Sequence, residues 1–112
     1  MPIFMWNEAN VEHIGGHGVT PEEAEYIVAN ASSPFPRRHE DEKWLVWGET
    51  ADGRPLQVIF IFQPDERVDV LRLAADERLD FQAGAKVIYV IHAIPMTSKM
   101  KRRNRGQRKR RK

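Results

Sequence analysis

The fold is decided by residues 43–63, KWLVWGETADGRPLQVIFIFQ. Two runs rich in β-branched and aromatic residues, Lys43–Glu49 and Leu56–Gln63, flank a polar segment that contains Asp52-Gly53. Asp-Gly between two such runs is typical of a β-hairpin, because glycine adopts the positive φ that tight hairpin turns require. The pattern therefore predicts two antiparallel strands.

Two helices are expected before this hairpin. The first begins after Asn7, a common N-terminal cap, and is expected to end at the glycines of positions 15 and 16. The second begins after Thr20 and covers about residues 21–30, where small and apolar residues recur at the i, i+3, i+4, i+7 spacing of a helix. Pro21 supports this start, because its fixed φ suits the first position of a helix.

The remaining segments complete an α+β domain. Residues 3–6 predict a short extended piece, Lys86–Ala93 predict an interior strand because both of its faces are apolar, and Thr97 predicts the start of a last helix. Residues 64–85 fit a short strand or a short helix equally well. Ser32–Arg38 contain two prolines and are expected to form a loop. A strand, two helices and then a sheet indicate an α+β fold.

The charge is concentrated at one end of the chain. The whole sequence has a formal charge of +2, yet residues 99–112 hold ten lysines and arginines and no acid. Residues 1–98 retain eight basic and sixteen acidic side chains, a formal charge of −8. We therefore predict one domain over residues 1–98 and a basic tail over residues 99–112, which is either a helical extension or disordered.

Composition narrows the class of protein further. The 112 residues include no cysteine, which excludes a disulfide framework, a thiolate zinc site and a cysteine nucleophile. No apolar run approaches the roughly 18 residues of a membrane-spanning helix, and the first residues lack the pattern of a secretion signal. We expect a cytoplasmic protein with no membrane partner.

Several short motifs, taken in order, resemble the BrnT-type toxin family. They are Trp6-Asn7-Glu8, the turn His17-Gly18-Val19 before Thr-Pro-Glu-Glu, the hairpin region of residues 48–53, and Ala93-x-Pro95-Met96-Thr97 before a run of Lys and Arg. The resemblance implies a RelE-like ribonuclease fold, an antiparallel sheet of three to four strands packed by two N-terminal helices and a C-terminal helix. It also implies a metal-free endoribonuclease toxin of a bacterial toxin–antitoxin system, held inactive by a cognate antitoxin of the ribbon-helix-helix type.

The sequence departs from this family at three positions. Family members usually carry a lysine where this chain has Gly16, and an arginine where it has Ile94. They also tend to have a glutamate shortly after the Met-Thr pair, where residues 99–101 here are Lys-Met-Lys. The alternative function is therefore a non-catalytic module of the same fold that binds nucleic acid or protein through its basic tail.

Metal-free RNA cleavage uses the 2′-hydroxyl of the substrate as nucleophile, so the protein must supply proton carriers and cations. His92, near the end of the interior strand, is the candidate acid or base, and a half-buried structural histidine is the alternative. The basic residues of the proline-rich segment are candidate phosphate ligands, and neutralisation by the acids at positions 40–42 is the alternative. The candidate catalytic residues are His92, Arg37, Arg38, His39 and Lys43, and the candidate RNA-binding residues are Lys101, Arg102, Arg103 and Arg105.

A metal site is a further alternative for the histidines. His13 and His17 have the i, i+4 spacing of two ligands on one face of a helix. The two glycines between them are expected to break that helix, and the spacing reveals no third ligand. The sequence therefore predicts no metal and no other cofactor.

Overall fold

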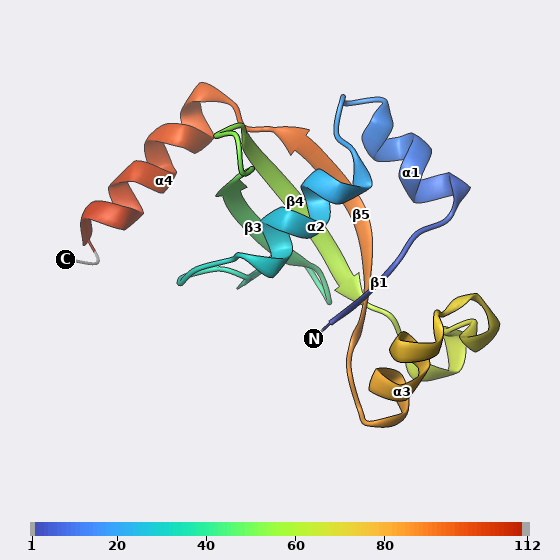
Figure 1. Ribbon diagram of the computed structural model, residues 1–112. Coiled ribbons are helices and arrows are strands. Elements are labelled where there is room, and N and C mark those ends of the chain that lie inside the picture. Colours follow the sequence, from blue (N-terminus) through green and yellow to red (C-terminus); the bar gives the residue numbers. More distant parts are fainter. Residues whose placement is uncertain (1, 111–112) are drawn as a thin grey trace.

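A computed structural model describes the backbone of residues 2–110 and the side chains of residues 2–106, and it confirms an α+β structure (Figure 1). One sheet has the strand order β1-β5-β4-β3-β2. The strands are β1 (Ile3–Met5), β2 (Arg37–Arg38), β3 (Trp44–Glu49), β4 (Pro55–Phe62) and β5 (Val87–Pro95). The helices are α1 (Glu8–Gly15), α2 (Pro21–Ala29), α3 (Ala75–Gln82) and α4 (Ser98–Arg110).

The predicted hairpin and the predicted interior strand are both confirmed. β3 pairs antiparallel with β4 from Trp44↔Phe60 to Glu49↔Pro55. Gly53, in the turn between them, has a φ of +86°, a conformation that glycine adopts without strain. β5 lies between β4 and β1, and β1 pairs with its first three residues, Val87–Tyr89.

The expected sheet of three to four antiparallel strands is wrong in two respects. β1 pairs with β5 in parallel, so the five-stranded sheet is mixed. β2 comes from the proline-rich segment that was expected to be a loop, and it pairs antiparallel with β3. The extended piece expected over residues 3–6 is β1, but both edge strands have only two or three residues. Such short strands give no alternating pattern that could show the direction of β1 or the presence of β2.

α1 and α2 begin where their capping residues predict. The side chain of Asn7 accepts a hydrogen bond from the backbone N–H of Asn10 at 3.1 Å. The hydroxyl of Thr20 accepts from the backbone N–H of Glu23 at 3.2 Å, and the Glu23 carboxylate accepts from the N–H of Thr20 at 3.0 Å. This reciprocal arrangement satisfies N–H groups that have no partner within the helix.

The C-terminal part of the chain resolves the open alternatives. Residues 64–85 form two short 3₁₀ turns and α3 rather than a strand. The basic tail is a helical extension through Arg110, and the Thr97 hydroxyl accepts from the N–H of Met100 at its start. Residues 111–112 of the tail lie outside the described residues. Within the part of the chain that is described, no helix is both long and apolar enough to cross a membrane.

The core lies mainly between the sheet and the two N-terminal helices (Figure 1). Ile14 of α1 and Ile27 of α2 are buried there against Val46 and Val58 of the sheet. Gly48 permits the close approach of α2, because an added Cβ would lie 3.4 Å from Cδ1 of Ile27. α2 therefore covers what we call the first face of the sheet, while α1 packs along β5 (Figure 1). The second face carries the side chains that point the other way.

We expect the link between Glu23 and Arg54 to weaken in acid. The Glu23 carboxylate accepts a hydrogen bond from the backbone N–H of Thr20 and forms an ion pair with Arg54 at 3.1 Å. Both contacts lower the pKa of Glu23 below its ordinary value. A lowered pKa stabilises the fold above the pKa of the unfolded chain, and this stability is lost as pH falls through the folded-state pKa. Glu23→Gln should therefore cost about 0.2–1 kcal/mol at pH 7 and progressively less below pH about 4.3.

Urea unfolding at pH 7 and again below pH about 4.3 measures the free energy of unfolding that Glu23→Gln loses at each pH. Glu22→Gln is the matched control, because Glu22 is an exposed acid of the same helical turn. A Glu23→Gln deficit that is unchanged at low pH would contradict the assignment.

Candidate active site

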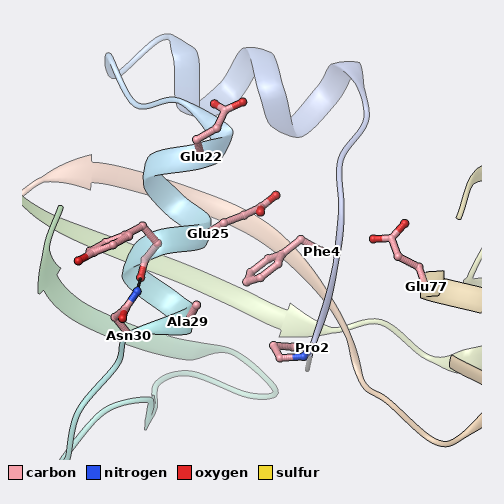
Figure 2. A pocket seen from close by; sticks show the side chains of 8 residues that line it. Pro2, Phe4, Glu22, Glu25, Ala29, Asn30 and Glu77 are labelled. Carbon is pink, nitrogen blue, oxygen red and sulfur yellow. Dashed lines mark hydrogen bonds between the residues drawn. The ribbon is translucent and has the colours of Figure 1, made fainter. Parts of the chain in front are cut away.

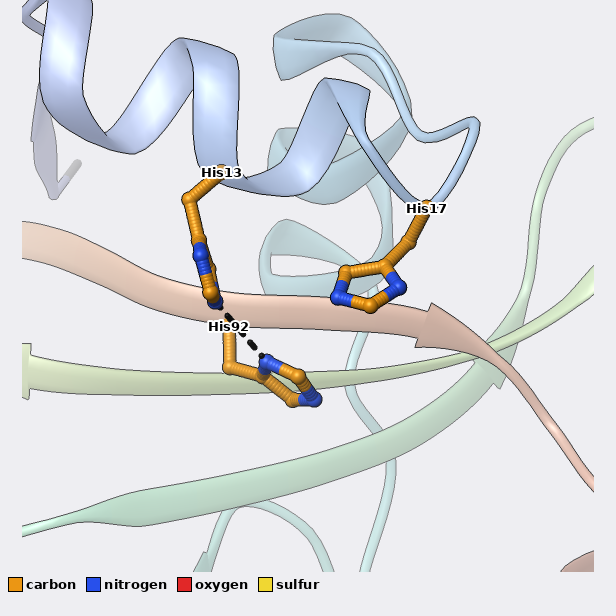
Figure 3. A group of neighbouring side chains, drawn as sticks. All are labelled: His13, His17 and His92. Atoms are coloured by element: carbon orange, nitrogen blue, oxygen red, sulfur yellow. Dashed lines mark hydrogen bonds between the residues drawn. The ribbon is translucent and has the colours of Figure 1, made fainter.

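Three of the four histidines of the chain converge beside β5 (Figure 3). Nε2 of His13 lies 3.2 Å from Nδ1 of His92. The ring centroids of His17 and His92 are 5.2 Å apart, and those of His13 and His17 are 5.7 Å apart. One ring nitrogen from each residue lies within 4.8 Å of the other two. We call His13, His17 and His92 the histidine cluster.

The buried side chain of Asn10 fixes α1 against the sheet. Its amide donates to the backbone oxygen of Met5 at 3.1 Å and to that of Val90 at 3.2 Å. The helix is therefore tied both to the end of β1 and to β5, since a buried amide needs such partners. His13 follows Asn10 by one helical turn, which brings it to β5 next to His92.

The two glycines end α1 as expected, but they do not separate His13 from His17. Gly15 lies within α1, and Gly16 keeps a right-handed helical conformation with φ −61° and ψ −22°. His17 therefore follows His13 by about one turn of about 3.6 residues. The left-handed conformation comes only at Gly18, where φ is +74°. His13 near the end of α1 and His17 in the turn after it therefore both point toward β5 (Figure 3).

A β-bulge precedes His92. The register between β4 and β5 shifts from Phe60↔Val90 to Ile59↔His92, which leaves Ile91 as an extra residue. Bulges re-aim side chains and are frequent next to active sites. His92 is thus the third member of the cluster, which sequence spacing did not reveal because it lies 75 residues beyond His17.

The surroundings of His92 lower its pKa below the ordinary value of histidine. Burial is the first cause, because it disfavours the charged ring. The second cause is repulsion by His17 and then by His13. The ring is therefore neutral over a wider pH range than a free histidine, with one nitrogen able to accept a proton.

Basic residues from two parts of the chain line a cleft on the second face. The cleft has a volume of about 540 Å³, with Leu45, Trp47 and Gln57 among its lining residues. Its basic side chains are Arg37, His39, Lys99 and Arg103, and we call this hollow the basic cleft. The first two come from β2 and the loop after it, and the last two from α4.

The expected pair of phosphate-binding arginines does not form. Successive residues of a strand point to opposite faces, so Arg38 departs from the cleft that Arg37 lines. The Arg38 guanidinium lies over the ring of Trp44, with 5.4 Å to the centroid, and donates to the backbone oxygen of Asp41 at 2.8 Å. Lys43 is also outside the cleft lining.

The tail residues expected to bind RNA also divide between surfaces. Arg103 lines the basic cleft. Lys101 and Arg105 line a separate hollow beside Glu49, and Arg102 is exposed. Lys99, which the sequence analysis did not single out, lies in the cleft because it is one helical turn before Arg103.

His92 and the basic cleft lie on the second face of the sheet, and His13 and His17 reach His92 from α1, which packs along β5. Arg37 pairs with Leu45, Leu45 with Ile59, and Ile59 with His92. Directly paired residues project to the same face. Three strand spacings separate the two ends of this row, so the backbones of Arg37 and His92 lie about 14 Å apart.

Three cations of the cleft take no part in ion pairs among residues 2–106. The ion pairs there are Arg54–Glu23 at 3.1 Å and His39–Glu40 at 3.9 Å, the latter only when His39 is protonated. The alternative of neutralisation by the neighbouring acids thus applies to His39 alone. Arg37 instead lies 5.6 Å from the ring centroids of Phe35 and Trp47. Arg37, Lys99 and Arg103 are available to an anionic ligand.

A second hollow of about 460 Å³ lies beside α2 and β1 and has the opposite charge (Figure 2). The carboxylates of Glu22, Glu25 and Glu77 line it. Glu25 accepts a hydrogen bond from the indole N–H of Trp6 at 2.7 Å. Carboxylates repel phosphate groups, so this hollow is unsuited to nucleic acid.

Comparisons of the chain with models of protein families, with curated proteins and with solved structures found no match. The chemistry of the second face is therefore the main guide to function. It combines three imidazoles, side chains able to carry protons, with cations that hold phosphate groups.

Proposed function

We propose that this protein is an endoribonuclease that cleaves single-stranded RNA without a metal, like the BrnT-type toxins that its motifs resemble. The carrying observation is that His92, the strand member of the histidine cluster, lies on the same sheet face as the basic cleft. The distance of about 14 Å between them corresponds to no more than about four stacked nucleotides. One RNA strand therefore reaches both.

The histidines supply the proton transfers of this reaction. The 2′-oxygen attacks the adjacent phosphorus, the bond from phosphorus to the 5′-oxygen breaks, and a 2′,3′-cyclic phosphate and a 5′-hydroxyl result. One imidazole of the cluster takes the 2′ proton, and a second gives a proton to the leaving 5′-oxygen. The basic cleft binds neighbouring phosphates and holds the strand in register.

The RelE-like fold, the cognate antitoxin and the cytoplasmic location belong to the same proposal. They rest on the sequence motifs, from Trp6-Asn7-Glu8 to Ala93-x-Pro95-Met96-Thr97. The antitoxin is a ribbon-helix-helix-type protein that forms a heteromeric complex with this chain. An adjacent reading frame for such a protein, and its co-purification with this chain, are the results that would support this part of the proposal.

Expression of the chain alone is expected to slow bacterial growth only slightly. The cations that family members place at the positions of Gly16 and Ile94 are missing, and one charge-stabilising donor contributes about 10²–10³-fold to such reactions. The double variant Gly16→Lys/Ile94→Arg should slow growth more. A side chain fits at Gly16, because φ is −61° and an added Cβ lies 3.5 Å from its nearest neighbour. Full arrest by the unmodified chain in growth curves would contradict this account.

The direct test of the proposal is cleavage of an end-labelled, unstructured RNA in the presence of a chelator. We expect fragments that end in 2′,3′-cyclic phosphates, and no cleavage of the DNA of the same sequence. An intact RNA after prolonged incubation would favour the non-catalytic binding module, and cleavage that requires added metal would contradict the proposed chemistry.

A further inference from the structure

We propose that the histidine cluster is a binding site for one transition-metal dication, held by a ring nitrogen from each of His13, His17 and His92. Neutral imidazole is a preferred ligand of zinc, nickel and copper. Three imidazoles with a fourth position for water are an established ligand set for zinc in proteins. The sequence prediction of no metal assumed that no third ligand was present, and β5 supplies it.

The separations of the ring nitrogens suit such an ion. A metal–nitrogen bond of about 2.0–2.1 Å in tetrahedral geometry places ligand nitrogens about 3.3–3.4 Å apart. Nε2 of His13 and Nδ1 of His92 are already 3.2 Å apart. The largest separation in the cluster is within 4.8 Å, so His17 must move by about 1.5 Å at most to match the zinc geometry. Its exposed side chain permits this rotation.

The contact between His13 and His92 marks the position that the ion takes. Two ring nitrogens at 3.2 Å form a hydrogen bond in which one nitrogen carries the proton and the other presents a lone pair. A metal ion replaces this shared proton and takes both lone pairs. Asn10 and the pairing of β5 hold the two backbones in place, so little ordering is needed on binding.

The ligand set also determines which ions bind. The group consists of nitrogen ligands and contains no carboxylate. Magnesium and calcium prefer oxygen ligands, so they are not expected to bind. His13 and His17 are exposed and His92 is half-buried, so an ion reaches the site from solvent and a water molecule completes its coordination.

Metal binding has a consequence for catalysis, and this consequence rests on the proposed function. The lone pairs that bind the ion are the ones that accept protons during cleavage. An occupied site therefore lacks its proton carriers, and RNA cleavage should fall in proportion to occupancy and recover when a chelator removes the ion. The histidine cluster then acts as a metal-sensitive control of the nuclease.

The experiment uses the full chain without an affinity tag, dialysed against a chelator and titrated with Zn²⁺ in a calorimeter. We expect one ion per chain. His17→Ala and His92→Ala should each weaken binding by at least about tenfold, since loss even of an outer partner of a ligand costs about 10–100-fold. His39→Ala is the matched control, because His39 is the one histidine outside the cluster. Its metal affinity should equal that of the unmodified chain.

Imidazole resonances in NMR give a second readout that does not depend on activity. Zn²⁺ should shift those of the histidine cluster and leave those of His39 in place. His17 lies in an exposed turn, so His17→Ala keeps the test decisive if His92→Ala fails to fold. No saturable binding, or binding that survives His17→Ala at full affinity, overturns the metal site.

The metal site and the nuclease fail in different ways. Zinc binding to a chain that never cleaves RNA supports the site and contradicts the nuclease. Cleavage by a chain that binds no zinc supports the nuclease and contradicts the metal site. Cleavage that zinc leaves unchanged at full occupancy contradicts the control of one by the other.

Discussion

His92→Ala is expected to lower the rate of RNA cleavage by about 10²–10⁴-fold, the usual contribution of one positioned acid or base. His92 contacts His13 directly and lies next to His17, so its loss removes one proton carrier and the hydrogen-bond partner of another. Single-turnover cleavage of a short labelled RNA at saturating protein measures the chemical step apart from binding.

The control for this variant is Tyr26→Phe. Tyr26 is an exposed residue of α2, the helix that covers the first face of the sheet. The Tyr26→Phe variant should therefore cleave RNA at the same rate as the unmodified chain. His92→Gln should be as slow as His92→Ala, because an amide neither accepts nor releases a proton in this range. Undiminished cleavage by either His92 variant would remove His92 from the mechanism.

Neutralising the cleft side of α4 is expected to weaken RNA binding far more than neutralising its other side. Lys99→Gln/Arg103→Gln and Lys101→Gln/Arg105→Gln remove the same charge from the same helix, and only the first pair lines the basic cleft. Truncation of the tail would be less informative, because Met100 packs against the core.

Salt titration distinguishes the two pairs quantitatively. For single-stranded RNA, the slope of log K against log salt should become less steep by about 0.7 for each phosphate contact that is removed. If five to seven tail cations engage phosphates, the unmodified slope is about −3.5 to −5. We expect the cleft pair to reduce its magnitude by about 1.4 and the control pair to leave it nearly unchanged. Fluorescence anisotropy measures K for each variant. If the two double variants lost affinity and slope equally, the tail would bind RNA without the cleft.

Local signals account for the elements that could be predicted from the sequence. Thr20 and Pro21 mark the start of α2 because a cap and a first-turn proline act within one helical turn. Asp52-Gly53 predicts the hairpin because turn geometry fixes the pairing of the strands beside it. The direction of β1 and the presence of β2 depend instead on contacts with strands distant in sequence.

The site could be predicted only in part, for the same reason. His92 and Arg37 were candidates by residue type, but their shared face follows from strand pairing across the sheet. The cluster needed Gly16 to stay helical and Ile91 to form a bulge, and neither is encoded by a local pattern. Strand alternation alone was sufficient to separate Arg37 from Arg38, once Arg37–Arg38 is assigned as a strand.

The central claim is that the second face of the sheet cleaves RNA through the 2′-hydroxyl of its substrate. The most direct measurement uses a single-stranded DNA that carries one ribonucleotide at a known position, incubated with the protein and a chelator. The account predicts a single cut on the 3′ side of that ribonucleotide, with a 2′,3′-cyclic phosphate on the upstream fragment. A strand that stays intact while all-RNA of the same sequence is cut, or a cut between two deoxynucleotides, would contradict it.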